Sequence, residues 1–126
     1  MDKSIINTTK APAPIGPYSQ AVKAGGFLFL SGQVPLIPGT SELKNGSITE
    51  ETAQVMENLK ALLEEAGIDF SHVVKTSIFL KEMSFFAEVN AEYGRYFDKD
   101  FPARETVAVK TLPKDVNVEI SMIAVL

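Results

Sequence analysis

The chain contains no cysteine and only one histidine. The absence of cysteine excludes disulfides, thiol catalysis and thiolate metal sites, and it is compatible with a reducing compartment. The single histidine, His72, cannot build the usual zinc sites, and we expect it at the surface where a helix gives way to a strand. Any catalytic chemistry is therefore expected from other side chains.

Long apolar runs and an excess of positive charge are also missing. Nowhere do eighteen apolar residues follow one another, and the start of the chain has no apolar signal segment, so we expect a soluble, cytoplasmic protein that spans no membrane. The formal net charge is -4 at pH 7, whereas proteins that bind nucleic acid by neutralising phosphates usually present a basic face. The composition thus argues against a nucleic-acid partner, although it leaves room for a local basic patch.

The remaining composition indicates one domain over residues 1–126. With 45% hydrophobic residues, a chain of this length matches the commonest domain size and can build a core without cross-links. No repeat, low-complexity segment or long linker divides it. The prolines of residues 11–17 predict an ordered or extended loop, because proline lacks a backbone donor and restricts the residue before it.

Hydrophobic periodicity predicts a first helix between Thr49 and Gly67. Thr49 is the expected N-cap, Glu50 and Glu51 suit the positive first turn, and Gly67 suits the C′ position. One apolar stripe is expected to face the core. Its members are Val55, Met56, Leu59, Leu62, Leu63 and Ala66.

A second helix is predicted after Ser84, which is its expected cap. Four apolar side chains share one face of this helix and are expected to point inward. They are Phe86, Val89, Tyr93 and Phe97. Asn90 falls on the same stripe, where an amide is either a satisfied core group or a ligand contact.

The other apolar runs predict strands over residues 19–24, 27–33, 73–80, 104–110 and 116–125. The predicted order is ββαβαββ, an α+β fold whose two helices pack on one face of a mixed sheet. Several strands are apolar on both sides, with Val107 and Val109 opposite Thr106 and Ala108. We therefore infer that a subunit interface, in a closed symmetric oligomer, covers the other face of the sheet.

Two charged residues near the end of the chain are the candidates for chemistry. Arg104 follows Pro102 at the start of a short strand, and its planar guanidinium suits a small carboxylate that accepts two parallel hydrogen bonds. Glu119 stands mid-strand between Val118 and Ile120, a position that favours a solvated or a functional face. The structural alternatives are an interface salt bridge for Arg104 and plain solvation for Glu119.

Five segments, in this order and spacing, resemble the Rid family, the reactive-intermediate imine deaminases also called YjgF-type proteins. They are residues 15–21 (IGPYSQA), 30–33 (LSGQ), Val89-Asn90 with Tyr93, residues 101–104 (FPAR), and residues 112–115 (LPKD) followed by 118–120 (VEI). The resemblance covers essentially the whole chain. Each segment alone is a weak signal, and the set of five is a specific one.

The resemblance implies a chorismate-mutase-like α+β fold that assembles as a homotrimer with three clefts between neighbouring subunits. Members of the deaminase branch hydrolyse 2-imino acids, such as 2-iminopropanoate and 2-iminobutanoate, to the 2-keto acid and ammonia. They use neither a metal nor an organic cofactor. The implied partners of this chain are therefore a small 2-imino acid and further copies of itself.

The resemblance also implies roles for individual residues. Arg104 would hold the substrate carboxylate, and Glu119 would orient or activate the attacking water. The other residues expected along the same cleft are Tyr18, Ser31, Gly32 and Asn90. Tyr18 has a structural alternative, which is to pin the proline-rich loop to the core.

Two positions depart from the family pattern. Glu105 replaces a small residue, and Thr106 stands where a cysteine is common. Thr106 shares a strand face with Arg104 and is expected near the site as a hydroxyl, whereas Glu105 points to the other face. Glu105 is expected either to pair with a basic neighbour or to fold back onto Arg104 and compete with the substrate.

Other functions stay open at this level. The same arginine would serve a non-catalytic trimeric module that binds small carboxylates. RNA cleavage or translation inhibition, an activity attributed to some relatives, ranks lower because the chain is acidic and its lone histidine has no evident catalytic partner. A holdase-like apolar surface is neither supported nor excluded.

Overall fold

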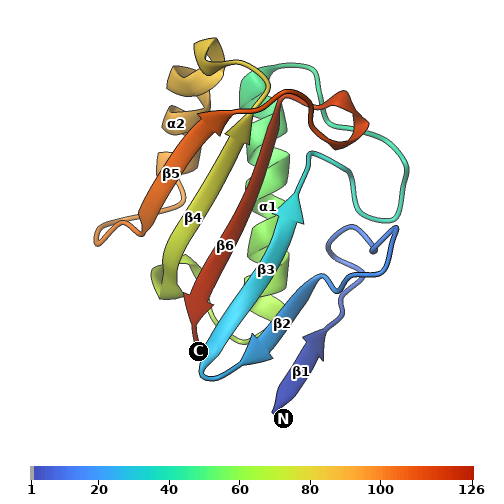
Figure 1. Ribbon diagram of the computed structural model, residues 1–126, viewed down its shortest axis with the longest axis vertical. Helices are drawn as coiled ribbons and strands as arrows, with labels where there is room; N and C mark the ends of the chain where they lie inside the picture. Colours follow the sequence, from blue (N-terminus) through green and yellow to red (C-terminus); the bar gives the residue numbers. More distant parts are fainter. Residues whose placement is uncertain (1) are drawn as a thin grey trace.

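The computed structural model describes residues 2–126, which form one six-stranded sheet and two α-helices (Figure 1). The strands are β1 (Lys3–Ile6), β2 (Ala21–Ala24), β3 (Phe27–Gln33), β4 (Val73–Leu80), β5 (Ala103–Ala108) and β6 (Val118–Val125). The helices are α1 (Ile48–Glu65) and α2 (Phe86–Gly94), with short 3-10 turns at Phe70–His72, Met83–Phe85 and Pro113–Asp115. The mixed α+β fold with two helices is as predicted.

The strands lie in the order β1-β2-β3-β6-β4-β5. All neighbouring pairs are antiparallel except β4 and β5, which run parallel and are joined through α2. The last strand, β6, is thus inserted between β3 and β4. This placement sets which residues of the second half of the chain become neighbours.

The predicted order lacks the strand β1 and was wrong in this respect, because the sheet has six strands and not five. The sequence of β1, KSII, does not alternate between apolar and polar residues and so carries no strand signal. Its pairing with β2, in which Ile6 stands opposite Ala21, forms the strand. A contact between segments separated by the proline-rich loop is not visible in local sequence.

Helix α1 begins two residues earlier than predicted. Ser47, not Thr49, is the N-cap: it has an extended backbone, and its Oγ accepts a hydrogen bond from the backbone N–H of Glu50 at 3.1 Å. Gly67 follows the helix with φ +78°, as expected of a C′ glycine. The five residues of the predicted stripe from Val55 to Leu63 are fully buried in the core, and its last member, Ala66, is partly buried.

Helix α2 differs more from its prediction. Its N-cap is Phe85 at the end of a 3-10 turn, and the Ser84 hydroxyl donates to Glu82 instead of capping the helix. The helix ends at Gly94, so Phe97 packs on the core from the following segment. Of the predicted inward face, Val89 and Tyr93 are buried, while Phe86 and Asn90 are exposed.

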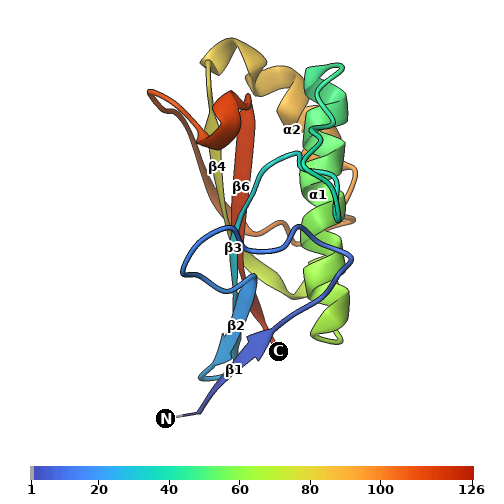
Figure 2. The same cartoon turned by 90° about the vertical axis from the view of Figure 1, so that its right-hand side faces the viewer.

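Both helices lie on one side of the sheet (Figure 2). The opposite face, called the open face here, exposes large apolar side chains, which include Ile5, Phe27, Phe29, Val107 and Val125. The prediction that two helices leave one sheet face uncovered is therefore confirmed. No helix of residues 2–126 is long and apolar enough to cross a membrane.

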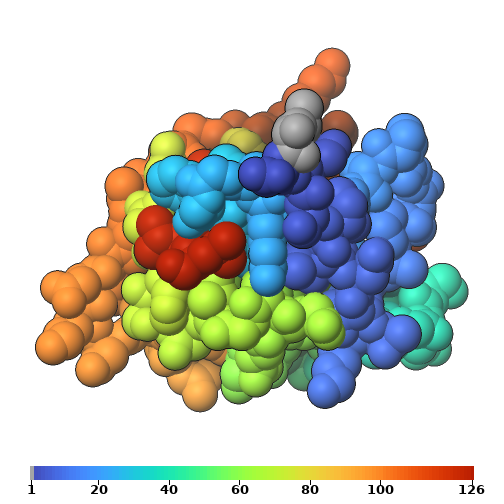
Figure 3. All heavy atoms as spheres, turned by 90° about the horizontal axis from the view of Figure 1, so that it is seen from below, coloured from blue at the N-terminus to red at the C-terminus, as the bar shows by residue number. Residues whose placement is uncertain are grey.

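The segment between α2 and β5 projects from one side of the molecule, as the view from below shows in orange (Figure 3). It carries Phe101, which is 65% exposed, and Asp100, which adopts a positive φ of 53°. The chain then turns through Pro102 into β5. This turn brings Arg104 to the edge strand beneath α2.

Candidate functional site

Arg104 lies near the start of β5, on the sheet face that α2 covers. It stands opposite Thr76 of β4, whose side chain is buried on that face. Its Nη1 donates to Asn90 Oδ1 at 2.7 Å. Its Cζ lies 5.2 Å from the centroid of the Tyr93 ring and 5.7 Å from that of Phe86. One amide and two aromatic faces therefore hold the guanidinium in place.

Most of the Arg104 guanidinium has no protein partner. The group carries five N–H donors, and within residues 2–126 the bond to Asn90 is its one side-chain hydrogen bond and no carboxylate forms an ion pair with it. A hollow of about 330 Å³ lies beside it, bounded also by Phe101 and Pro102. We call Arg104, Asn90, Phe86 and Tyr93 the arginine half-site, and it has the donors and the room to bind a small carboxylate.

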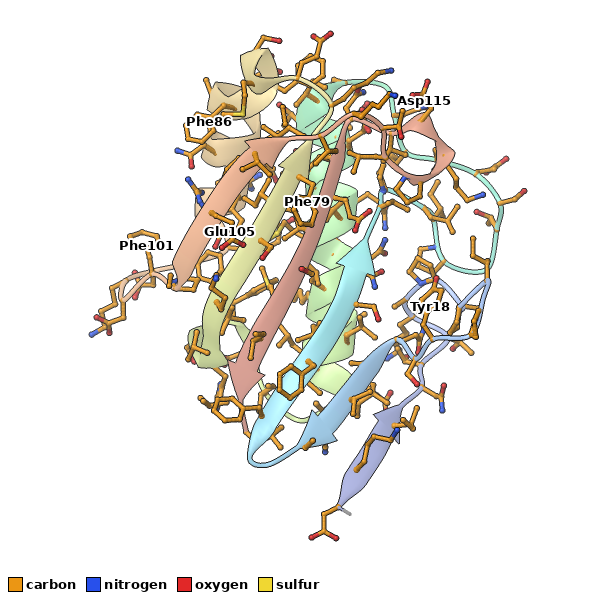
Figure 4. The ribbon with its side chains drawn as sticks, in the orientation of Figure 1. Tyr18, Phe79, Phe86, Phe101, Glu105 and Asp115 are labelled. Carbon is orange, nitrogen blue, oxygen red and sulfur yellow. The ribbon has the colours of Figure 1, made fainter. Side chains whose placement is uncertain are left out.

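Glu119 lies on β6, and its side chain points to the open face. It pairs with Phe79 of β4, which stands on the face turned away from α1 (Figure 4). The carboxyl is half-buried, and its loss of solvent raises its pKa above the ordinary value. It lines a mainly apolar hollow of about 280 Å³ together with Ile15, Tyr18 and Lys114. A carboxyl in such a setting is suited to exchange a proton with a water molecule.

Gly32 lies directly beneath the Glu119 carboxyl. The pairing of β3 with β6 shifts its register between Leu30 and Gln33, and this irregularity brings Gly32 next to Glu119. A Cβ added at Gly32 would overlap Oε2 of Glu119. Glycine is therefore required here for space, because any side chain would displace the carboxyl.

In any reaction that uses the Glu119 carboxyl, replacement of Gly32 by alanine is expected to lower kcat/KM about 10²-fold, because an active group moved by about 1 Å loses activity on that order. The overlapping atoms belong to the flexible end of Glu119, so we expect little change in thermal unfolding. Steady-state kinetics and calorimetry on Gly32→Ala test both parts. The matched control is Gly32→Ala in a Glu119→Gln background, where no further loss is expected; an additive loss would show that glycine serves another purpose.

We call Glu119, Gly32, Ser31 and Tyr18 the glutamate half-site. The Ser31 hydroxyl is committed to the protein, since Oγ donates to the Ser19 carbonyl at 2.5 Å. Tyr18 is half exposed, and its Oη accepts a 3.5 Å hydrogen bond from the backbone N–H of Ile15. The structural alternative for Tyr18, pinning of the loop, is thus compatible with its place on the wall of the hollow.

Gln20 is a residue whose part in this wall was not predicted. Its buried Nε2 donates to the carbonyls of Thr8, Ala11 and Pro12 at 3.0, 3.3 and 2.9 Å, and its Oε1 accepts from the N–H of Thr8 at 2.8 Å. These bonds fold the proline-rich loop against the sheet. The sequence did offer a signal for Gln20, because it directly precedes the apolar start of a predicted strand. A glutamine buried there must find hydrogen-bond partners for its amide.

The two departures from the family pattern lie on opposite faces of β5. Glu105 points to the open face, where it pairs with Lys75 at 2.8 Å and accepts a hydrogen bond from Ser77. These two hydrogen bonds lower its pKa, and Glu105 does not fold back onto Arg104. Thr106 shares the face of Arg104 but does not line the hollow beside it, and its buried Oγ1 has no hydrogen-bond partner among the described residues.

Within one chain the two half-sites lie on opposite faces of the sheet. The residues of the arginine half-site face the helices, whereas Glu119 faces away from them, and β4 runs between their strands. Figure 4 shows the same separation: Phe86 and Phe101 lie at one edge of the molecule and Tyr18 at the other. A single copy therefore does not bring Arg104 and Glu119 to one ligand.

The fold of this small α+β domain is shared by known proteins. The family model described as Endoribonuclease L-PSP matches residues 8–126. A RutC family protein of Pyrococcus horikoshii is 52% identical over 97% of this chain and 97% of its own length. Protein DfrA of Myxococcus xanthus is 52% identical over 99% of this chain and 97% of its own length.

Solved structures agree with the sequence comparison. A Rid family protein of Yersinia pestis superposes with a TM-score of 0.96 at 44% identity, covering 99% of this chain and 100% of that one. RidA of a Psychrobacter species gives 0.93 at 41% identity, with 98% and 99% covered. TdcF of E. coli with bound serine gives 0.93 at 38% identity, with 98% of each chain covered. The chain belongs to the endoribonuclease L-PSP family, the YjgF/Rid proteins, as its motifs predicted.

Proposed function

We propose that this protein hydrolyses small 2-imino acids, such as 2-iminobutanoate and 2-iminopropanoate, to the 2-keto acid and ammonia. The observation that carries the proposal is the arginine half-site. A guanidinium held by Asn90 and two aromatic rings, with its other donors unpaired in the described chain, is suited to the carboxylate of such a substrate. TdcF of E. coli, a structural relative, was solved with serine, which also carries an α-carboxylate.

The reaction needs positioning more than a strong nucleophile. The carbon of a protonated imine next to a carboxylate is already electrophilic, so a water molecule held against it can attack. Glu119 accepts a proton from that water as the carbon–oxygen bond forms, and it returns this proton to the nitrogen of the tetrahedral adduct. As the carbon–nitrogen bond breaks and ammonia leaves, the hydroxyl of the adduct gives its proton to Glu119 and becomes the keto oxygen; Glu119 then passes that proton to ammonia or solvent. The raised pKa of the half-buried Glu119 favours such an exchange.

We further propose that the site forms between copies of the chain in a closed trimer. The arginine half-site of one copy would face the glutamate half-site of its neighbour, and the exposed apolar side chains of the open face would be buried between copies. This arrangement resolves the separation of Arg104 from Glu119 within one chain. It would also exclude bulk water and so strengthen the polar contacts of the substrate.

The experiment that tests this function is complementation by mixing. Arg104→Ala and Glu119→Gln proteins are each expected to be inactive, but when unfolded together and reassembled at equal amounts they should regain activity. In a randomly mixed closed ring, about one quarter of the clefts receive an intact Arg104 from one copy and an intact Glu119 from the next. The readout is the decay of 2-iminobutanoate, generated in solution by an amino-acid oxidase or dehydratase and trapped with semicarbazide.

Three results of this experiment have distinct meanings. Recovery near one quarter of the wild-type rate supports both the deaminase and the shared cleft. No recovery from well-assembled hybrids contradicts the shared cleft. Wild-type protein that removes imines no faster than buffer contradicts the deaminase itself.

A second candidate function is a non-catalytic module that binds small carboxylates. It is favoured by one observation: Arg104 is oriented entirely by residues of its own chain, so it can bind a ligand whether or not Glu119 activates water. Binding of 2-oxobutanoate without turnover of any imine would select this candidate. RNA cleavage, which the name of the matching family suggests, ranks below it because the chain carries a net charge of -4.

A further inference from the structure

Beside Arg104 lies a hydrogen bond between two buried residues, of which Tyr93 lines the hollow next to the guanidinium and Thr76 does not. The Tyr93 hydroxyl donates to Oγ1 of Thr76 at 3.0 Å. Tyr93 is 4% exposed and Thr76 is fully buried. Burial raises the pKa of the Tyr93 hydroxyl, so that it keeps its proton and remains a donor.

The partners of this bond are placed by different elements. Thr76 stands on β4 directly opposite Arg104, on the same face of the sheet. Its β-branched side chain has few rotamers, and its strand β4 is paired on both sides. The position of the Thr76 hydroxyl is therefore well restrained. Tyr93 comes from α2 and packs its ring 4.9 Å from that of Phe97. The bond to Thr76 therefore joins the helix to the sheet beside Arg104.

The orientation of the Tyr93 ring bears directly on Arg104, whose Cζ lies 5.2 Å from the ring centroid. An aromatic ring attracts a cation over its face and not at its edge, so a turned ring would lose that attraction. Asn90 restrains the guanidinium through a hydrogen bond at 2.7 Å, and the Tyr93 ring restrains it from its face. These two contacts act on the guanidinium from different directions and together fix the orientation of its plane.

We propose that Thr76 and Tyr93 are positioning residues that set the plane of the Arg104 guanidinium for a carboxylate ligand. This inference rests on the proposed function, because it assigns Arg104 the substrate carboxylate. Thr76 does not line the hollow beside Arg104, and the Tyr93 hydroxyl is bonded to Thr76, so only the Tyr93 ring borders the ligand. Their effect is to reduce the conformational freedom that Arg104 would otherwise lose on binding, so they act on ligand affinity and not on the chemical step.

Four single substitutions separate positioning from stability. Thr76→Val has the same shape without the hydroxyl, Thr76→Ser keeps the hydroxyl, and Tyr93→Phe keeps the ring. Thr52→Val is the matched control, since Thr52 is also fully buried and its hydroxyl donates to the Ile48 carbonyl at 2.8 Å within α1. Each is measured for thermal unfolding, for kcat and KM with 2-iminobutanoate, and for the dissociation constant of 2-oxobutanoate, the keto acid product.

We expect Thr76→Val and Tyr93→Phe to raise KM and the dissociation constant about three- to tenfold while kcat stays unchanged, as the loss of one oriented cation–π contact implies. The double variant should be no worse than either single one, because both remove the same bond. Thr76→Ser should regain most of the affinity. Thr52→Val should lower the unfolding temperature only. If Thr76→Val behaves like Thr52→Val, with affinity unchanged, the inference is overturned.

A spectroscopic readout keeps this test independent of catalysis. The Nε–H resonance of Arg104, observed by ¹⁵N NMR and assigned with Arg104→Lys, senses the ring current of Tyr93. A shift of this resonance in Thr76→Val and Tyr93→Phe that reverts in Thr76→Ser supports positioning; an unchanged resonance contradicts it. Should wild type fail to hydrolyse imines, the proposed function falls, while this resonance still decides whether Thr76 and Tyr93 orient Arg104.

Discussion

Replacement of Arg104 by alanine is expected to lower kcat/KM for 2-iminobutanoate by about 10²–10⁴-fold. The wild-type guanidinium can offer two charge-assisted hydrogen bonds to the substrate carboxylate, and each is worth about 1.5–3 kcal/mol. Arg104→Lys keeps the charge but loses the paired geometry, so its loss should be intermediate. The semicarbazide-trapping assay measures both variants.

The chain offers a matched control for this loss, because it contains only one other arginine, Arg95. Arg95 is exposed at the end of α2 and bonds Glu92 through its Nη1 at 2.8 Å. Arg95→Ala removes the same charge from the surface and should leave kcat/KM within about twofold of wild type. Equal losses of kcat/KM in Arg95→Ala and Arg104→Ala would show that the loss follows from the change in net charge. That result would contradict a carboxylate site at Arg104.

The second large effect is expected for Glu119→Gln. The amide has the shape of the carboxyl but cannot accept the proton of the attacking water, so kcat should fall about 10²–10⁴-fold with little change in KM. Glu105→Gln is the control, because Glu105 is a carboxylate on the same face of the sheet that pairs with Lys75 and does not line the hollow. A fall in kcat for both variants would show that the open face matters for assembly and not that Glu119 takes the proton.

The pH dependence of activity in the wild type and in Glu119→Gln adds a second test of this role. Burial raises the pKa of Glu119 above its ordinary value of 4.5, and the base must be ionised to act, so activity should be lost as the pH falls through that raised pKa. This acid limb should be absent from the residual activity of Glu119→Gln. For folding the sign is opposite: a raised pKa means that the ionised form opposes the native state, so Glu119→Gln should be no less stable than wild type at neutral pH.

Local sequence was sufficient for the elements whose signals are local. The α1 stripe and Gly67 predicted that helix nearly to its ends, and alternation along β5 correctly placed Thr106 with Arg104 and Glu105 on the other side. Where two candidate caps compete within one turn, as Ser47 and Thr49 do, only the backbone geometry decides between them. The prediction of Ser84 as the cap of α2 was wrong for a related reason. A 3-10 turn precedes that helix and moves its start to Phe86.

The site divides in the same way. Residue type and motif by themselves determined the family and singled out Arg104 and Glu119, because a guanidinium and a mid-strand carboxyl have chemistry that needs no neighbours to be recognised. The motifs also predicted Asn90 and Gly32 along the same cleft, but which charged residue each of them contacts was decided by tertiary structure. Asn90 and Tyr93 reach Arg104 across the α2–β5 packing, and Gly32 reaches Glu119 through irregular strand pairing.

Above all, only the tertiary structure decided that Arg104 and Glu119 face opposite sides of one sheet. Alternation gives the relative faces of residues within a strand, but it cannot relate two strands whose pairing is unknown. The insertion of β6 between β3 and β4, with Ile78 opposite both Ile120 and Thr106, sets that relation. Strand pairing depends on contacts between residues distant in sequence, which local patterns do not reveal. It places Arg104 and Glu119, which the motifs assign to one site, on opposite faces of the sheet within a single chain.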